Sequence, residues 1–412
     1  MALVVQKFGG TSVADPDRIR NAARRVVETV RAGNQVVVCV SAMGGETDAL
    51  VTLANDLGEG QPAPREYDVL LASGEQKTIA LLSIAIHQLG QEAQSFTGWQ
   101  MGMHTDAAHG RARIVHIDCA RLRSVLDTGA VAVIAGFQGV DEGGNITTLG
   151  RGGSDTSAVA VACALEADVC EIYTDVDGVF TADPRIVPTA SKLQSLSFDE
   201  MLEMASLGAE VLQVRSVKFA MRYGLPLHVR SSFHGGEGTW VTREEDAMER
   251  LVVSGVTYNK NESKITLRAV KDQPGVAGRI FTPLSDAGIV VDMIVQNLSS
   301  DGSTDMTFTV PVGDYAAALK IGQAAAEALG AEVEGDENIA KVSVVGVGMK
   351  DHAGVATKMF SVLADEAINI QMISTSEIKI SVVIEEQYTE HAVRALHQAF
   401  LEEGAAEPAE QS

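Results

Sequence analysis

The sequence predicts an α/β protein in which a mostly parallel β-sheet, sandwiched by helices, precedes two copies of a β-α-β-β-α-β module. Up to about residue 235, short β-rich runs alternate with helical periods, and the runs are apolar on both faces, as in covered parallel sheets. Beyond that point the chain repeats itself after 79 residues. The intervening stretch 233–250 contains glycines and charges without a clear period, which indicates a boundary and a linker at 236–250.

Hydrophobic periodicity predicts the elements of the N-terminal part, residues 1–235. The strand candidates are the runs 3–8, 35–41, 92–97, 131–137, 169–175 and 225–231. Helical periods cover 75–89, 119–128, 154–166 and 198–223, and one more apolar helix face is made by Ile19, Ala22, Ala23, Val26, Val27 and Val30. Ligands of such sheets bind at the carboxyl ends of the strands, so the functional site is expected in the loops that lead from strands into helices.

Composition limits the classes of protein to which the chain can belong. Its 412 residues are enough for two or three domains, and 46% hydrophobic with 21% charged residues is typical of a globular chain. The net charge of −23 argues against nucleic acid or an anionic membrane as a partner. An anionic substrate would therefore need a local concentration of positive groups.

The N-terminus and the cysteines lead us to expect a cytoplasmic protein. MALVVQKFGG passes directly into a strand-like run and has neither the basic start nor the cleavage site of a signal peptide. The apolar run 131–137 is too short to span a bilayer. The cysteines form no CxxC pair and are expected to be reduced core thiols; they are Cys39, Cys119, Cys163 and Cys170.

The C-terminal repeat consists of KDQPGVAGRIFTPLSDAGIVVDMI at 271–294 and KDHAGVATKMFSVLADEAINIQMI at 350–373. The first copy continues to a final strand, whereas the second does not. A sheet without its edge partner exposes unpaired backbone groups, so the run 251–259 is expected to fill that place. The predicted modules are 264–340, inserted in the chain, and 251–259 together with 341–405.

The first candidate loop is KFGGTSVAD, at the end of the first strand. Lys7 ends that strand, and Gly9 and Gly10 let backbone N–H groups approach a ligand. A phosphate with a lysine against it fits this pattern, and so does an ordinary strand–turn–helix connection. The sequence has no GxxxxGK(S/T), and the first strand–helix turn has no GxGxxG, so both common nucleotide fingerprints are absent.

Two further loops carry polar residues. SAMGGETD at 41–48 places small residues and hydroxyls after the second strand. LASGEQ at 71–76 places Glu75 at the expected start of an apolar helix. A glutamate in a first helical turn either interacts with the helix dipole or binds a substrate amine.

The stretch GRGGSDT at 150–156 opens another helix. Ser154 or Asp155 could cap this helix, while Gly152 and Gly153 free the backbone. Arg151 can make a bidentate pair with a carboxylate. The alternative is a capped helix with a surface arginine.

The last candidate loop is YTDVDGVFTADPRIVP at 173–188. Asp175 and Asp177 alternate just past a strand, and Gly178 allows a turn. These carboxylates could order water around Mg²⁺ or serve only as local hydrogen-bond acceptors. Arg185 could approach a nucleotide phosphate.

In order and spacing, KFGGTS, SAMGGETD, SGE, TTLGRGGSDT and YTDVDGVFTADPR resemble the motifs of the aspartate kinases (aspartokinases) of the amino-acid kinase family. The repeat resembles the tandem ACT domains of these enzymes, which are ferredoxin-like βαββαβ units. The resemblance spans essentially the whole chain. It implies a catalytic domain at 1–235 that uses ATP and Mg²⁺ to phosphorylate the β-carboxylate of L-aspartate, the first step toward lysine, threonine and methionine.

The resemblance also implies roles for individual residues, with no dedicated metal ligand among them. Lys7 and Asp177 would be catalytic. Glu75 would hold the substrate amine and Arg151 a carboxylate, within the substrate-binding set Ser41, Thr47, Glu75, Arg151, Gly152, Gly153, Ser154 and Asp155. The ATP-binding set would be Lys7, Phe8, Gly9, Gly10, Tyr173, Thr174, Asp175, Phe180, Asp183 and Arg185.

The implied reaction fits these residue types. The acceptor carboxylate and ATP are both anionic, and two unit charges 4 Å apart interact by about 4 kcal/mol at an effective dielectric near 20. Catalysis is then mainly positioning and charge neutralisation by lysine, Mg²⁺, helix N-termini and loop N–H groups. No general base is expected, because the nucleophile is already ionised at neutral pH.

One position departs from the family pattern. Many relatives carry a lysine that reaches toward ATP phosphate where this chain has Glu210. Lys218 or Arg215 could compensate for the missing positive charge.

The ACT-like pair implies feedback inhibition by lysine and threonine, although two modules used only for dimerisation are the alternative. The second copy has Ala353 where the first has Pro274, so the two loops could bind different ligands. A homo-oligomer through the ACT domains is expected, and a shorter subunit could begin at Met248. The implied effector contacts are Asp272, Gly275, Val276, Asp292, Gln296, Asn297, Met349, Asp351, Val355, Asn369 and Ser376.

Other functions stay open at this point. Glutamate 5-kinase and N-acetylglutamate kinase share the expected fold, although neither is expected to carry two ACT units. A nucleoside monophosphate kinase would need more positive charge for its second phosphorylated substrate. From a different class, the chain could be an amino-acid sensor with an inactive kinase domain, against which the presence of Lys7, Glu75, Arg151 and Asp177 argues.

Overall fold

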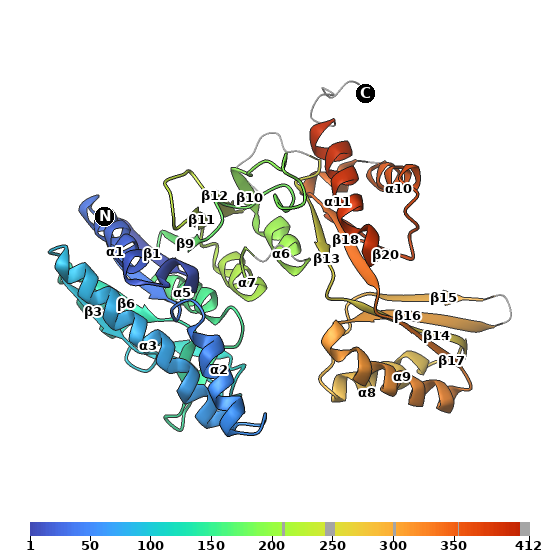
Figure 1. Cartoon of the computed structure of the whole chain (residues 1–412), viewed down its shortest axis with the longest axis horizontal. Helices are drawn as coiled ribbons and strands as arrows, with labels where there is room; N and C mark the ends of the chain where they lie inside the picture. Colours follow the sequence, from blue (N-terminus) through green and yellow to red (C-terminus); the bar gives the residue numbers. More distant parts are fainter. Residues whose placement is uncertain (208–210, 244–251, 300–301, 353, 404–412) are drawn as a thin grey trace. The chain divides into compact units, whose positions relative to one another are not determined.

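The strands and helices of the computed structural model belong to two units (Figure 1). The structure describes residues 1–207, 211–243, 252–299, 302–352 and 354–403. The first unit contains Met1–Val179, Lys192–Ala205 and Glu210–Met248, and the second contains Phe180–Ser191, Ser206–Ala209 and Glu249–Ser412. The predicted class is confirmed, since the first unit has a mostly parallel sheet between helices and the second has two small antiparallel sheets.

An eight-stranded sheet in the order β10-β12-β11-β9-β1-β2-β6-β3 forms the centre of the first unit. Neighbouring strands are parallel except β11 and β12, which are antiparallel. Lys7 of β1 is in register with Cys39 of β2 and Ile172 of β9, so the carboxyl ends of three central strands meet at one edge. The strands are β1 (Leu3–Phe8), β2 (Gln35–Val40), β3 (Ala93–Phe96), β6 (Val131–Ala135), β9 (Val169–Thr174), β10 (Ser195–Ser197), β11 (Leu227–Ser231) and β12 (Thr239–Thr242).

Side chains of the central strands alternate between two helical layers. Val36, Val38 and Val40 share a core with α1 (Pro16–Arg31) and α3 (Pro64–Gln88). Cys39 points to the other face, where its thiol lies 3.5 Å from the Ser154 carbonyl oxygen of α5 (Gly153–Leu165), and burial raises the pKa of the thiol. The other helices of this unit are η1 (Gly10–Val13), α2 (Glu46–Leu57), α4 (Ala120–Leu126), α6 (Phe198–Ser206) and α7 (Val214–Tyr223).

Two predicted helices are wrong in their extent. The helix expected at 75–89 begins at Pro64, which takes a first-turn position where its missing N–H is harmless. Gly74 lies inside this helix, where a Cβ would come 2.7 Å from the Ala42 Cβ, so the glycine marks close packing instead of a helix start. The segment expected as one helix at 198–223 forms α6 and α7, and residues 208–210 between them lie outside the described part.

Short strands account for the other differences. The predicted linker 236–250 contains β12, because Trp240 stacks on His228 of β11 with ring centroids 4.0 Å apart and Val241 is buried. Residues 244–251 lie outside the described part. A second sheet in the order β5-β4-β7-β8 was not predicted, because three or four residues are too few for a recognisable alternation. Its strands are β4 (Met103–Thr105), β5 (Ile114–Ile117), β7 (Gln138–Val140) and β8 (Ile146–Thr148).

Helix α3 is, among the described residues, the one helix that is long and apolar enough to cross a membrane. Half of its most apolar window is buried inside the structure. Leu71, Ile79, Leu82 and Ile86 are among its buried side chains, so α3 packs here as a core helix.

The second unit contains the two repeated modules. The first has the sheet order β15-β16-β14-β17 with helices α8 and α9, and the second has the order β13-β18-β20-β19 with helices α10 and α11. The strands are β13 (Gly255–Asn259), β14 (Ser263–Lys271), β15 (Ile294–Leu298), β16 (Ser303–Val310), β17 (Glu332–Asp336), β18 (Ile339–Val345), β19 (Met372–Thr375) and β20 (Lys379–Glu385). The helices are α8 (Val276–Asp286), η3 (Val312–Asp314), α9 (Tyr315–Leu329), η4 (Val347–Asp351), α10 (Val355–Asp365), η5 (Glu386–Tyr388), α11 (Thr389–His397) and the π-helical turn η6 (Gln398–Glu402).

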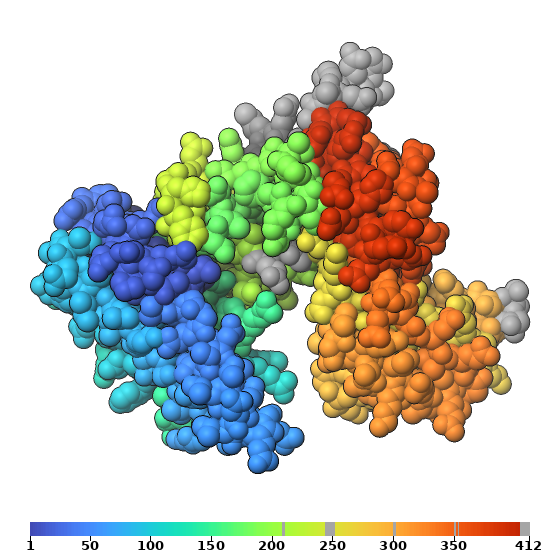
Figure 2. Space-filling view, viewed as in Figure 1, coloured from blue at the N-terminus to red at the C-terminus, as the bar shows by residue number. Residues whose placement is uncertain are grey.

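Strand β13 precedes the first module in the chain but lies at the edge of the second module's sheet. It pairs antiparallel with β18, from Gly255 opposite Val345 to Asn259 opposite Lys341. The first module, from β14 to β17, therefore lies within the chain of the second. Figure 2 shows the two modules, coloured orange and red, in contact, and Met293 of the first shares an apolar cluster with Met372 and Val383 of the second.

The segment Phe180–Ser191 belongs to the second unit, although the sequence pattern assigned it to the N-terminal domain. Ala182, Ile186 and Val187 are buried in the core of the second module. The Thr181 carbonyl oxygen accepts a hydrogen bond from the Val256 N–H at 2.8 Å, and the Thr181 hydroxyl lies 2.8 Å from Nε2 of the buried His397. Packing with a distant part of the chain decides this placement, and local sequence does not reveal it.

Candidate active site

A buried ion pair joins two of the predicted loops. Nζ of Lys7, at the carboxyl end of β1, lies 2.5 Å from Oδ1 of Asp155, in the first turn of α5. Each side chain is only 11% exposed. The contact brings the lysine of the first loop and the start of the GRGGSDT helix to the same edge of the sheet.

Glycines allow three loops to approach one another at this edge. A Cβ on Gly9 would lie 3.3 Å from the Lys7 Nζ, and a Cβ on Gly10 would lie 3.0 Å from the Ala42 carbonyl oxygen. The Gly9 N–H donates to the Tyr173 carbonyl oxygen at 3.3 Å, so it ties β1 to the end of β9. The two glycines therefore serve close backbone packing around Lys7.

Glu75 points into the same region from the middle of α3. Its Oε1 accepts a hydrogen bond from the Ala42 N–H at 2.9 Å, and the residue is 3% exposed. Oε2 is buried without a hydrogen-bond partner among the described residues. Burial disfavours the charged form and raises the pKa of Glu75 to about 7. A cation that reached Oε2 would satisfy this carboxylate.

The loop after β2 carries the other predicted substrate residues. Ser41 follows β2 directly, and its N–H donates to the Phe8 carbonyl oxygen at 3.1 Å. Thr47 lies in the first turn of α2, which begins directly after the left-handed Gly45. Both residues are partly exposed, in the loop whose Ala42 holds Glu75.

The predicted side-chain cap of α5 is wrong. The cap position is Gly152, which has φ of 69°, and no side chain caps the helix. A Cβ on Gly152 would lie 1.9 Å from the Gln213 Cγ, so the site excludes side chains. Asp155 is consequently free to pair with Lys7, and Ser154 lies beside Gly136, whose Cβ would come 2.8 Å from the Ser154 Cβ. Arg151 is exposed directly before this turn.

Phe137 is a residue of this region that the sequence pattern did not reveal. It has φ of 68°, an uncommon value for a residue with a side chain. Its carbonyl oxygen accepts from the Leu149 N–H at 2.9 Å, and a Cβ on Gly153 would lie 2.8 Å from its Cδ2. The strained residue thus packs against the turn that carries Arg151.

The acidic loop after β9 meets a histidine that was also missed. Oδ1 of Asp177 lies 2.8 Å from Nε2 of His234, and both side chains are about half exposed. Thr174 donates to Asp175 at 3.2 Å. Asp177 lies three residues after the end of β9, and His234 lies three residues after the end of β11. Since these strands are parallel neighbours, their pairing could have predicted that His234 lies near Asp177.

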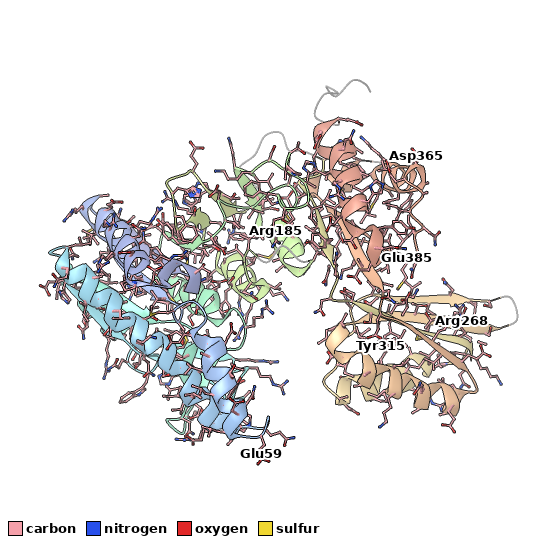
Figure 3. The ribbon with its side chains drawn as sticks, in the orientation of Figure 1. Glu59, Arg185, Arg268, Tyr315, Asp365 and Glu385 are labelled. Carbon is pink, nitrogen blue, oxygen red and sulfur yellow. The ribbon has the colours of Figure 1, made fainter. Side chains whose placement is uncertain are left out.

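Several predicted nucleotide residues have side chains away from this edge. The rings of Phe8 and Tyr173 are buried and stack with centroids 4.6 Å apart, so only their main chain borders the site. Phe180, Asp183 and Arg185 belong to the second unit. There Arg185, labelled in Figure 3, hydrogen-bonds to Asp183 at 2.8 Å and thereby lowers the pKa of that carboxyl.

The structure explains one of the two cations considered as replacements near Glu210. Arg215 donates to the carbonyl oxygens of Leu149 and Ala112, at 3.2 and 3.1 Å, so it supports the loop before Arg151. Lys218 is exposed on α7. Glu210 itself lies outside the described residues.

The predicted effector residues occupy equivalent places in the two modules. Gly275 and Val276 start α8 just after Asp272, and Val355 starts α10, with Met349 buried in η4 before it. Gln296 and Asn297 lie on the edge strand β15; Asn369 precedes the edge strand β19 and Ser376 follows it. Asn297 also lines a hollow of about 510 Å³ between the modules. Asp292 is bound to the buried Lys341, which also lies 2.9 Å from Glu262, while Ala353 and the side chain of Asp351 lie outside the described part.

Comparison with known proteins gives a consistent result. The model of the amino acid kinase family matches residues 2–231, and the ACT domain model matches 268–324 and 342–400. The chain is 59% identical to the aspartokinase of Pseudomonas aeruginosa over 97% of this chain and 98% of that protein. It is 51% identical to the aspartokinase of Corynebacterium glutamicum, over 97% and 96% of the two chains.

Solved structures agree with these relatives. E. coli aspartokinase III in complex with aspartate and ADP has a TM-score of 0.82 and 28% identity, covering 96% of this chain and 99% of that one. The complex of the same enzyme with lysine and aspartate has a TM-score of 0.75 at 28% identity, covering 97% and 99%.

The raised pKa of Glu75 predicts a pH-dependent stability. Because the native carboxyl holds its proton up to about pH 7, against 4.5 for an ordinary glutamate, its contribution is present below pH 4.5 and is lost as the pH rises toward 7. Glu75→Gln should abolish that loss, which is on the order of 3 kcal/mol. Urea unfolding at pH 5 and pH 8 measures it. Glu66→Gln, on an exposed turn of the same helix, should keep the wild-type profile, and an unchanged profile in Glu75→Gln would contradict the prediction.

Proposed function

The chain belongs to the amino acid kinase family and, within it, to the aspartokinases, and we propose that it transfers the γ-phosphoryl group of ATP to the β-carboxylate of L-aspartate. The products are 4-phospho-L-aspartate and ADP. The observation that carries this proposal is the convergence of Lys7, Glu75 and the Arg151 turn at one edge of the parallel sheet.

Glu75 and Arg151 divide the recognition of the substrate. Within the described part of the chain, the buried Oε2 of Glu75 has no hydrogen-bond partner, and the ammonium group of aspartate supplies one. Binding of this cation favours the ionised form of Glu75, whose pKa burial raises to about 7. Arg151 offers a planar pair of donors to a carboxylate, and Ser41, Thr47 and the Gly152–Asp155 turn complete the pocket.

Lys7 supplies positive charge where the two anionic reactants meet. Asp155 lies 2.5 Å from its ammonium group and fixes the lysine at the edge of β1, close to the Gly9–Gly10 backbone. The protein then needs to supply neither a general base nor a covalent intermediate, since the aspartate carboxylate is already ionised and attacks the phosphoryl group directly. Lys7 neutralises charge on the transferring group.

The nucleotide lies along the loops after β1 and β9 in this proposal, with Phe8, Gly9, Gly10, Tyr173, Thr174 and Asp175 beside it and Phe180, Asp183 and Arg185 as further contacts. Among the described residues, no group of three or more His, Cys, Asp and Glu side chains could hold a metal ion. Mg²⁺ usually binds through one or two carboxylates together with substrate phosphates. The half-exposed Asp177 and the exposed Asp175 fit this donor set. When bound, Mg²⁺ would neutralise phosphate charge.

We propose further that the two ACT modules regulate the reaction. The start of each module's first helix, at Gly275 and Gly354, offers N–H groups that suit an amino acid carboxylate. Lysine and threonine are the proposed effectors, and the E. coli enzyme crystallised with lysine supports lysine. Assembly through the ACT modules, a short subunit from Met248 and a cytoplasmic location are parts of the same proposal.

The direct test is an assay of ADP release with L-aspartate, L-glutamate and N-acetylglutamate, each with and without lysine plus threonine. Of the three acceptors, only L-aspartate is expected to be phosphorylated. N-acetylglutamate lacks the free amine that Glu75 binds. The two effectors should reduce that turnover by about 5- to 150-fold, the range of ordinary allosteric coupling. Absence of turnover with all three acceptors would favour the inactive sensor, and preference for another acceptor would overturn the assignment.

Lys7→Ala is expected to lower kcat by about 100- to 1000-fold, the usual effect of removing one donor aimed at developing charge. Aspartate should still bind, measured by isothermal titration. Since the change leaves Asp155 buried and unpaired, the double variant Lys7→Ala with Asp155→Asn controls for this charge and should be equally slow. A kcat near the wild-type value in either variant would disprove the role of Lys7.

A further inference from the structure

Helix α3 holds a second buried carboxylate that the reaction proposed above does not use. Asp68 is fully buried and lies seven residues before Glu75, two turns along the same face of the helix. The Thr148 hydroxyl donates to Oδ1 at 2.6 Å, and the Thr148 N–H donates to Oδ2 at 3.1 Å. The Gly110 N–H lies 3.0 and 3.1 Å from the two oxygens, and Nδ1 of His109 lies 2.8 Å from Oδ2.

All these donors come from two segments that frame the Arg151 turn. Thr148 is the last residue of β8, three positions before Arg151. Gly110 packs against the next part of the turn, since a Cβ on Gly150 would lie 3.1 Å from the Gly110 carbonyl oxygen. The two segments are also joined directly, because the Ala112 N–H donates to the Thr148 carbonyl oxygen at 2.8 Å. Asp68 thus fixes both the end of β8, which leads into this turn, and the Gly110 segment, which packs against it.

Hydrogen bonds connect this turn to the start of α5, so the position of the turn determines the position of the helix. The Gly153 N–H donates to the Gly150 carbonyl oxygen at 2.9 Å, and Arg215 bridges Leu149 and Ala112 from outside. Two residues after Gly153, Asp155 holds Lys7. A carboxylate buried with this many donors is a rigid anchor, because removing any donor leaves charge without compensation.

We infer that Asp68 is a positioning residue that fixes the Arg151 turn relative to the amine site at Glu75, and thereby the affinity of the pocket for aspartate. The inference rests on the proposed function. One helix carries the amine-binding group directly and anchors the carboxylate-binding turn through Thr148 and Gly110. An amino acid that is bound through its amine and a carboxylate needs both binding groups at a fixed separation, and this frame provides it.

The test compares three threonine variants of the full chain. Thr148→Val removes the hydroxyl bond to Asp68 and keeps the main-chain bond, whereas Thr148→Ser keeps both. Thr147→Val is the matched control, because the adjacent buried threonine hydroxyl bonds at 2.6 Å to Thr105 and not to Asp68. Asp68→Asn, which replaces two acceptors by one acceptor and one donor, is the stronger variant.

Thr148→Val should raise the KM for aspartate by about 10-fold, the usual effect of one lost hydrogen bond to a charged group, with a smaller change in kcat. The KM for ATP should stay within twofold. Thr148→Ser and Thr147→Val should retain the wild-type KM for aspartate. Asp68→Asn should raise the KM for aspartate further than Thr148→Val.

Hydrogen–deuterium exchange separates this inference from the proposed function. Amides of residues 148–154 should lose protection in Thr148→Val and Asp68→Asn, whether or not aspartate is the substrate. Unchanged protection, or folded variants with an unchanged KM for aspartate, would overturn the positioning role. Failure of the wild-type enzyme to phosphorylate aspartate would instead count against the proposed function, and the exchange measurement would still decide whether Asp68 anchors the turn.

Discussion

The buried contact between Lys7 and Asp155 is the interaction on which the arrangement of the active site depends. Burying two charges costs several kcal/mol per ion, and their attraction offsets this cost only when the geometry is good. The two charged groups lie 2.5 Å apart, and each side chain is 11% exposed. In a chain with a net charge of −23, the pair keeps one cation inside the loops that we propose receive the anionic reactants. Removal of either partner would leave an uncompensated buried charge.

Glycines in the surrounding loops leave the space that this contact needs. Gly9 and Gly10 let β1, β2 and the lysine approach, and Gly152 accepts a left-handed conformation in which Gln213 lies where a Cβ would be. Each glycine costs conformational entropy on folding. The same backbone geometry also explains why α5 has no side-chain cap: the cap position is occupied by Gly152, and Asp155 is used for Lys7.

Local sequence predicted the parts of the structure that depend on local chemistry. The six strand candidates correspond to β1, β2, β3, β6, β9 and β11, because long apolar runs with flanking turns give a clear period. The predicted start of α3 at residue 75 was wrong, because the helix continues through Gly74, which packs against Ala42, 32 positions earlier in the chain. His234 and Phe137 were missed because their roles follow from strand adjacency and from a backbone angle, which no single stretch of sequence displays.

The placement of 180–191 follows the same rule. The motif YTDVDGVFTADPR is continuous in sequence, yet its first half ends β9 of the first unit and its second half is buried in the core of the second. Thr181 is held there by Val256 and His397, residues that follow it by 75 and 216 positions. Hydrophobic burial of Ile186 and Val187 is non-directional and carries no local signature, so a motif can be identified correctly while the structural body to which it belongs is not.

Helix α3 connects these observations. With a rise of about 1.5 Å per residue, the seven positions from Asp68 to Glu75 span roughly 10 Å along one rigid face. Asp68 is bound by donors from the segment before the Arg151 turn, and Glu75 is bound by Ala42 of the loop after β2. Two loops that are far apart in sequence are therefore set against a single helix. A helix that is packed against Ala42 at Gly74 and hydrogen-bonded to Thr148 through Asp68 cannot slide without breaking both contacts. The rigidity of this helix, more than the identity of any one loop, keeps the positive and negative groups of the site at fixed separation.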